Sequence, residues 1–406
     1  MEKKLSKKII FLISIIFIGN LFAQKDFEDY QKTQEKQFAK FVTMDKKAYE
    51  EYAKADREAF AKFKNEMEEK WGNFATSSRK DWVEYSNNNE TRSIVDFEKG
   101  SVKIEILIPK DNPDNEEMIN KKLLEAIKEL AFAKGKTKDY EIPNEKPIAF
   151  SDKPVLENQL QMKNGEIVNN QNIEKYSKEI LDNSQIEQVE MELKKDKTKK
   201  KKGSETFETK QPEFLKYSIS LELAPENIQE RAKQHLPYMK KYATYYDLPL
   251  DLVMAMIHTE SFYNPKARSY IPAYGLMQLV PRTAAYEAYE YVYDKKKMLP
   301  ANYLYNPKNN IELGTAYLYR LKTHYFKNVE NSKSRNYCII AAYNTGSGNV
   351  NRAFGSKNLQ DTAKKINAMT SEQVYNVLRT QLPFTETRKY MKKVTDRRAK
   401  YRSWGI

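Results

Sequence analysis

The chain has 406 residues, enough for two or three ordinary domains, and a formal net charge of +14. This basic balance favours an acidic partner, such as nucleic acid, an anionic membrane or an acidic polymer outside the cytoplasm; a merely solvated lysine-rich surface is the alternative. The sequence contains no nucleic-acid-binding motif, which excludes nucleic acid as a partner. Its single cysteine excludes an internal disulfide framework and a cysteine zinc cluster.

The charge and hydropathy pattern of residues 1–23 predicts a secretory signal peptide. Several lysines precede an apolar stretch from Ile9 to Phe22, which is shorter than the roughly 20 apolar residues that span a bilayer. Ala23 is a small residue before a cut ahead of Gln24. We therefore expect an exported protein, periplasmic or associated with the cell envelope, with retention as an uncleaved anchor as the alternative. No cysteine lies near the cut, so we do not expect a lipoprotein.

An internal repeat follows in residues 25–74. Aromatic pairs recur every eleven residues, at Phe27/Tyr30, Phe38/Phe41, Tyr49/Tyr52, Phe60/Phe63 and Trp71/Phe74. Eleven residues make about three helical turns, so each pair returns to nearly the same face of a helix. At about 1.5 Å per residue, a helix over the whole repeat would be longer than a compact domain. We therefore predict a spacer or a self-associating helix with the aromatic stripe as its contact seam; a helix packed on its own domain is the alternative.

Residues 75–224 predict a small α+β accessory domain. Alternating apolar residues indicate a hairpin that turns at Gly100, and a later alternating run indicates another strand of the same sheet. The expected elements are strands over Arg92–Glu98, Ser101–Ile108 and Phe214–Leu223, and helices over Glu116–Lys134 and Ile173–Leu193. The lysine run Lys194–Lys202 is typical of a solvated loop, with contact to polymer carboxylates or anionic lipid as the second interpretation.

Helical periodicity dominates residues 225–406 and predicts an all-α domain. The expected helices cover Ile228–Tyr246, Leu250–Glu260, Thr283–Tyr293, Ile311–Tyr325, a segment beginning at Tyr337, Ser371–Gln381 and Thr385–Arg402. The predicted fold class is therefore mainly α: an all-α domain preceded by a small α+β domain and a long N-terminal helix.

Glu260 is the first candidate for catalysis, because it ends a strongly apolar helix shortly before Pro265. The apolar residues from Leu252 to Ile257 exclude water, and this raises the pKa of a nearby carboxyl group and keeps it protonated near neutral pH. Such a group can act as a general acid on a glycosidic bond. The alternative is an ordinary surface carboxylate at a helix end.

Several short motifs occur in order around this glutamate. They are Glu260-Ser261 with Asn264-Pro265, Gly275-Leu-Met-Gln278, Ala342-Tyr-Asn344 with Gly346, and Glu386-Thr-Arg-Lys-Tyr390. In these motifs the chain resembles the soluble lytic transglycosylase family, whose catalytic domain is lysozyme-like. More narrowly, Lys70-Trp-Gly72, Thr91-Arg-Ser93 and Lys216-Tyr-Ser-Ile-Ser220 resemble the accessory domain of the membrane-bound lytic murein transglycosylase C family.

The resemblance implies that Glu260 protonates the bond between MurNAc and GlcNAc in peptidoglycan glycan strands and then accepts the proton of the muramyl C6 hydroxyl. The product would be 1,6-anhydromuramic acid, formed without water. The resemblance also implies substrate-binding residues, each with a structural alternative such as capping or loop support: Ser269, Gln278, Tyr343, Asn344, Glu386 and Tyr390. Among them, Tyr343 is expected to hydrogen-bond the acid. The sequence contains no cofactor signature and no metal-site pattern, and we expect neither.

Two other functions remain open from the residues alone. If Glu386 or an aspartate activates a water molecule, the cleft is that of a lysozyme-type muramidase, which hydrolyses the same bond. If nothing is cleaved, the protein is a peptidoglycan-binding scaffold that works through its long helix. The presence of Glu260 within its motif favours an enzyme.

Overall fold

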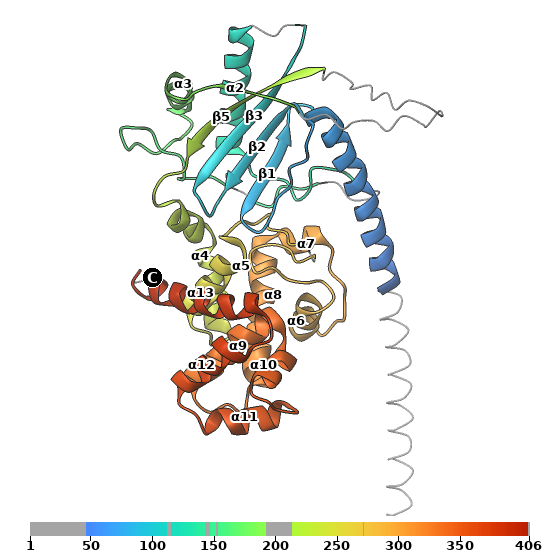
Figure 1. Ribbon diagram of the computed structural model, residues 1–406, viewed down its shortest axis with the longest axis vertical. Coiled ribbons are helices and arrows are strands. Elements are labelled where there is room, and N and C mark those ends of the chain that lie inside the picture. Colours follow the sequence, from blue (N-terminus) through green and yellow to red (C-terminus); the bar gives the residue numbers. More distant parts are fainter. Residues whose placement is uncertain are drawn as a thin grey trace, which may run out of the picture.

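The computed structural model describes residues 46–111, 115–142, 147–151, 153–191, 213–270 and 272–404. Figure 1 shows an antiparallel sheet with two helices above an all-helical part, and a further helix of residues 46–71 along one side. The predicted fold class, a mainly α chain with an all-α part preceded by a small α+β part, is confirmed. The domain limits at residues 75 and 225 stay predictions. The predicted signal peptide, the first aromatic pairs and the lysine run lie outside the described residues.

The sheet has the strand order β1-β2-β3-β5-β4, with antiparallel neighbours throughout. Its strands are β1 (Asp81–Ser86), β2 (Thr91–Asp96), β3 (Ser101–Pro109), β4 (Glu187–Val189) and β5 (Phe214–Glu222). The predicted hairpin is present as β2 and β3. Gly100 lies in its turn at φ 73°, a conformation that glycine adopts without steric cost. The sequence did not predict β1, because a six-residue segment with polar ends gives too little alternation.

Helices cover both faces of the sheet, because successive side chains of a strand point to opposite sides. On one face Ile104, Ile106 and Ile108 pack with α2 (Glu116–Phe132) and α3 (Ile173–Asn183). On the other face Leu107 packs with helix 46–71. The predicted helix to Leu193 was too long: the chain becomes extended at the end of α3 and enters β4.

The aromatic stripe of helix 46–71 packs on the protein's own sheet. Phe63 and Trp71 are buried at 6% and 0% exposure, and Phe63 contacts Tyr85 of β1 edge to face at a centroid distance of 5.4 Å. The indole Nε1 of Trp71 donates to the Asn89 carbonyl at 3.0 Å, and the Arg92 guanidinium lies 4.5 Å from the Trp71 ring. Phe63 and Trp71 therefore fit the alternative of a helix packed on its own domain, and self-association through the stripe stays a prediction.

The lower part of the molecule is built around α5. The helices are α4 (Asn227–Tyr245), α5 (Leu250–Ser261), α6 (Ala284–Tyr293), α7 (Ala301–Tyr305), α8 (Pro307–Arg320), η1 (Leu321–Tyr325), α9 (Ser332–Thr345), α10 (Ser347–Ala353), α11 (Leu359–Asn367), α12 (Ser371–Gln381) and α13 (Thr385–Arg402). Every α5 residue from Leu252 onward is buried, and α13 packs against it. Within the ranges described, no helix combines the length and apolar character needed to cross a bilayer.

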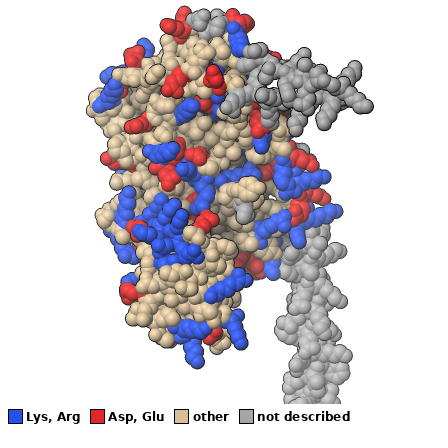
Figure 2. Space-filling view, viewed as in Figure 1, with Lys and Arg blue, Asp and Glu red and all other residues tan. Residues whose placement is uncertain are grey.

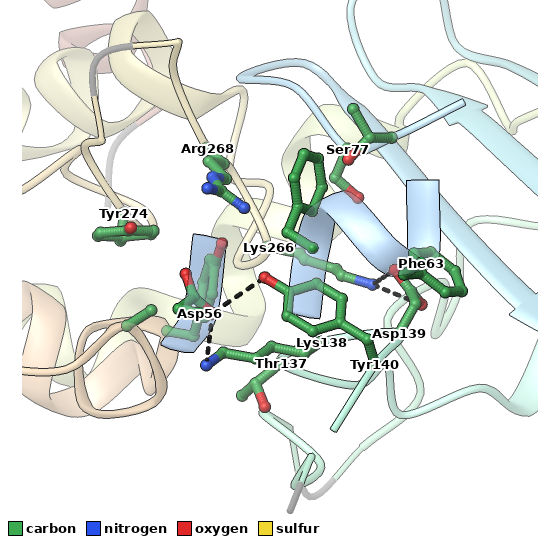
Figure 3. A pocket seen from close by; sticks show the side chains of 14 residues that line it. Asp56, Phe63, Ser77, Thr137, Lys138, Asp139, Tyr140, Lys266, Arg268 and Tyr274 are labelled. Carbon is green, nitrogen blue, oxygen red and sulfur yellow. Dashed lines mark hydrogen bonds and ion pairs between the residues drawn. The ribbon is translucent and has the colours of Figure 1, made fainter. Parts of the chain in front are cut away.

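Buried charges join helix 46–71, the α+β part and the helical part (Figure 3). Asp56 of the helix forms an ion pair with Lys138 at 2.9 Å and accepts a hydrogen bond from the Tyr140 hydroxyl at 3.0 Å. Lys266, from the loop after α5, forms an ion pair with Asp139 at 2.8 Å and is also buried. Removing one partner of such a buried pair leaves an uncompensated charge, so these contacts fix how the parts sit together.

Candidate active site

A cleft of about 470 Å³ lies between the α+β part and the helical part. Its walls come from the segment before β1, from the end of α5 with the following loop, and from the start of α13. Positively charged side chains outnumber acidic ones in this lining: Arg79, Lys80, Arg268, Lys389 and Lys393 face Glu98 and Glu386. Figure 2 shows Lys and Arg gathered where α13 crosses the visible face. The cleft therefore favours an anionic ligand.

Glu260 lies in the last turn of α5, where the helix reaches this cleft. Phe262 ends the helix in a left-handed conformation at φ 53°. Only 6% of Glu260 is exposed, and burial raises the pKa of its carboxyl group above the ordinary value. The predicted combination of an apolar helix and a buried terminal acid is therefore present.

Two side chains hold the carboxylate of Glu260. The Tyr390 hydroxyl donates to Oε1 at 2.6 Å, and Arg79 Nη2 lies 3.2 Å from Oε2. Both contacts favour the charged form and lower the pKa of Glu260, although burial is the larger effect. The negative charge of Glu386 raises that pKa further. The site thus keeps the acid protonated more readily than a surface glutamate while supporting the carboxylate once the proton has left.

Arg79 is the residue that sequence reasoning missed. It lies 181 positions before Glu260, in the segment between helix 46–71 and β1. Its Nε donates to the Glu260 carbonyl at 3.0 Å and its Nη2 to the Thr259 carbonyl at 3.1 Å, so it also caps the C-terminal end of α5. Asn264 fixes the approach of this segment by donating to the carbonyls of Ser78 and Asp81. A single arginine in a loop gives no sequence signal for any of these contacts.

The segment from Tyr274 to Gln278 is a turn that Asn310 of α8 and Ser261 of α5 hold through hydrogen bonds to its backbone. Gly275 has φ 75° and no room for a side chain, since a Cβ atom would lie 2.5 Å from Asn310 Nδ2. The Gln278 amide donates to the carbonyls of Ala267 and Gly275, both at 3.0 Å. Its nitrogen thus supports the loop, while its buried Oε1 has no hydrogen-bond partner among the described residues. Substrate binding by Gln278 stays a prediction that would use this oxygen.

The remaining predicted residues lie around the same site in different ways. The Tyr343 hydroxyl donates to the Met277 carbonyl at 2.7 Å, so Tyr390 makes the contact with the acid that we expected from Tyr343. Ser269 lines the cleft, and its Oγ accepts from the Ala273 amide at 3.2 Å.

Asn344 lines a second hollow of about 560 Å³ at the start of α13. Glu386 belongs to both hollows; its side chain is 77% exposed and lies 3.6 Å from Arg79 Nη1. The described residues include no cluster of three or more metal-ligating side chains. The expectation that no metal is needed stays a prediction.

Comparison with known families identifies the two parts of the chain. Residues 237–366 match the model of the transglycosylase SLT domain, and residues 36–204 match that of the membrane-bound lytic murein transglycosylase C N-terminal domain. The chain thus combines a region similar to the transglycosylase SLT domain with one similar to the N-terminal domain of membrane-bound lytic murein transglycosylase C. The resemblance seen in the sequence motifs is thereby confirmed. The second match covers helix 46–71 and the strands β1 to β4, whereas β5 lies beyond its end at residue 204.

Individual relatives cover the chain only in part. Membrane-bound lytic murein transglycosylase C of Sodalis glossinidius is 38% identical over 186 residues, which are 46% of this chain and 52% of that protein. The Haemophilus influenzae protein of the same name is 38% identical over 185 residues, 45% of this chain and 51% of that protein. The chain thus spans about half the length of these relatives. The crystal structure of the 70-kDa soluble lytic transglycosylase from Escherichia coli is 26% identical, with a TM-score of 0.32, and matches 41% of this chain and 24% of that one.

Proposed function

We propose that this protein is a peptidoglycan lytic transglycosylase that cleaves the β-1,4 bond between MurNAc and GlcNAc without water and leaves 1,6-anhydroMurNAc ends. The observation that carries the proposal is the buried carboxyl group of Glu260 at the end of α5, held by Tyr390 beside a cationic cleft. Cell-wall remodelling or turnover is the role that such an activity serves. The matches to the transglycosylase SLT domain and to the lytic murein transglycosylase C N-terminal domain support this choice of substrate.

In the first step the protonated Glu260 gives its proton to the glycosidic oxygen, and the bond from this oxygen to the muramyl C1 breaks. GlcNAc leaves with a free hydroxyl group, and positive charge develops on the muramyl ring. Because burial raises the pKa of Glu260, the proton stays available at higher pH than it would on a surface glutamate. The Tyr390 hydroxyl, 2.6 Å from Oε1, stabilises the carboxylate that remains.

In the second step this carboxylate takes the proton of the muramyl C6 hydroxyl, whose oxygen closes on C1. One bond breaks and one forms, and Glu260 recovers its proton, so the cycle consumes no water. A single acid therefore serves both steps. Gln278 Oε1, Ser269, Tyr343 and Asn344 are the proposed contacts that orient the sugars.

The hydrolytic alternative requires a second carboxylate that activates water. Among the described residues, Glu386 is the carboxylate whose negative charge acts on Glu260. It is largely exposed, and the guanidinium of Arg79 contacts both carboxylates. This arrangement supports substrate binding as the role of Glu386.

The site of action that fits this substrate is the cell envelope, on the periplasmic side. The signal peptide predicted in residues 1–23 supports this location. The name of the relatives, which describes them as membrane-bound, supports it too. We place the protein in the periplasm or at the outer membrane, with its basic surface against peptidoglycan or an anionic membrane. The proposal includes self-association through the aromatic pairs before residue 46. Sedimentation equilibrium of the full chain measures it.

The test is mass spectrometry of muropeptides released from purified sacculi by the full chain and by Glu260→Gln, with Glu386→Gln as the matched carboxylate variant. We expect anhydro-muramyl ends from the wild type, none from Glu260→Gln, and anhydro ends at a reduced rate from Glu386→Gln. Reducing ends formed with water would establish a muramidase and make Glu386 the second carboxylate. If the wild type releases no products, the interpretation as a noncatalytic peptidoglycan-binding scaffold remains.

A further inference from the structure

Arg79 acts against the chemistry that Glu260 has to perform. A general acid must carry its proton, whereas the guanidinium beside Oε2 favours the carboxylate. Arg79 also covers the acid: Arg79 and Tyr390 line the cleft, and Glu260 lies behind them. The substrate oxygen reaches Glu260 only after this ion pair has been loosened. Something that binds during the reaction must therefore compete for Arg79.

The geometry of Arg79 shows where a competitor binds. Nε and Nη2 hold the backbone carbonyls at the end of α5, and Nη2 also contacts Oε2 of the acid. Nη1 turns toward Glu386 at 3.6 Å, beyond the length of a good hydrogen bond. The Glu386 side chain is 77% exposed, and the Arg79 side chain is 36% exposed. Glu386 thus occupies the cleft-facing edge of the guanidinium loosely, where a carboxylate from solution can replace it.

The surroundings favour a carboxylate as that competitor. Lys389 and Lys393 of α13 and Arg268 of the loop after α5 line the same cleft. An arginine fork binds a carboxylate through two parallel hydrogen bonds, a geometry that a sugar hydroxyl does not match. In peptidoglycan the carboxylates belong to the stem peptides carried by the muramyl sugars, next to the bond that is cut.

We propose that Arg79 makes cleavage selective for peptide-bearing glycan strands: a carboxylate of the substrate takes over the guanidinium from Glu386 and draws it away from Glu260, which frees the acid for the glycosidic oxygen. The inference rests on the proposed transglycosylase activity. It gives the α+β part a function in the reaction, because this part supplies the residue that senses the substrate charge.

The consequence for pH dependence follows from the groups that face Glu260. These are Arg79 from the α+β part, Tyr390 and Glu386 from α13, and Tyr343 from α9. Removing the charge of Arg79 raises the pKa of Glu260, so the fall in kcat/KM on the alkaline side moves to higher pH. In the wild type a bound substrate carboxylate draws Arg79 away and raises the pKa of Glu260 in the same way. With peptide-bearing strands, the alkaline fall of kcat therefore lies at higher pH than that of kcat/KM. With strands that lack peptides, the two should coincide.

The experiment compares peptide-bearing strands with strands stripped of peptides by an amidase, using full-length wild type, Arg79→Gln and Arg79→Lys. We expect the wild type to prefer peptide-bearing strands by about fivefold in kcat/KM, the ratio that corresponds to about 1 kcal/mol for a half-exposed ion pair. Arg79→Gln should lose this preference and show the alkaline shift on both substrates. Arg79→Lys keeps the charge and should retain the wild-type pH profile with a smaller preference.

Lys99→Gln is the matched control, since it removes one charge from an exposed lysine of the same α+β part outside the cleft. It should keep the preference and the pH profile of the wild type. If Arg79→Gln slows cleavage of both substrates equally and leaves the pH profile in place, Arg79 only caps α5 and the proposal is wrong. Equal wild-type rates on both substrates also overturn it. Neither result touches the proposed activity, which the anhydro ends of the wild-type products report separately.

Discussion

Replacing Tyr390 with Phe removes one oxygen atom from the site and leaves the ring in place. Tyr390 is 4% exposed, and its hydroxyl lies 2.6 Å from Glu260 Oε1. A hydrogen bond to a charged group contributes about 1.5–3 kcal/mol, and the lost oxygen leaves Oε1 without this donor in a buried position. Since about 1.36 kcal/mol corresponds to a factor of ten in rate, kcat should fall by about tenfold to a hundredfold.

The pH dependence of Tyr390→Phe separates this mechanism from simple disruption. The Tyr390 hydroxyl lowers the pKa of Glu260, so its removal raises that pKa and moves the alkaline fall in activity to higher pH. The assay is the initial rate of anhydro-muramyl release between about pH 4 and about pH 9. Tyr263→Phe is the matched control: its buried hydroxyl donates to the Met254 carbonyl of the same helix at 3.1 Å. A wild-type rate and pH profile for Tyr390→Phe would refute the reasoning.

Three further substitutions test other parts of the structure. Glu260→Gln should stabilise the protein at neutral pH: burial raises the folded-state pKa, so the unfolded chain loses this proton first and wild-type stability falls as pH rises above about 4.3. The difference in melting temperature should therefore grow from acid to neutral pH. Gly275→Ala should cost about 1–3 kcal/mol in urea unfolding, because the new methyl group overlaps Asn310. Trp71→Ala should cost about 3–5 kcal/mol in the same assay, since it empties a buried site and exposes Arg92.

The sequence was most informative where local physics decides the structure. Helix α5 was predicted to within one residue, because a long apolar run followed by Pro265 leaves few alternatives. Helix α12 was predicted at its observed limits, and its Thr370 and Gln373 form a capping box. The short helices α7, α10 and α11 were not predicted, since five to nine residues carry too little periodicity to distinguish them from loops.

The site itself could be predicted only in part, for a different reason. Glu260 stands out because its own helix determines its burial, whereas its partner Arg79 depends on how two separate parts of the chain pack. The same limit explains why the prediction for Tyr343 failed: its hydroxyl was expected to contact Glu260 but donates to the Met277 carbonyl. Residues one turn apart on a helix share a face, but which of two tyrosines from different helices reaches a carboxylate is a tertiary question.

The position of the acid at a helix end couples its chemistry to the packing between the parts. The last carbonyls of α5 concentrate negative charge, which disfavours a carboxylate there and adds to the effect of burial. The same carbonyls, of Thr259 and Glu260, are the groups that Arg79 binds. A shift of the segment that carries Arg79 would therefore change the capping of the helix and the charge beside the acid together. Because Asn264 holds that segment in place from the helical part, contacts away from the reacting atoms help to set the proton affinity of Glu260.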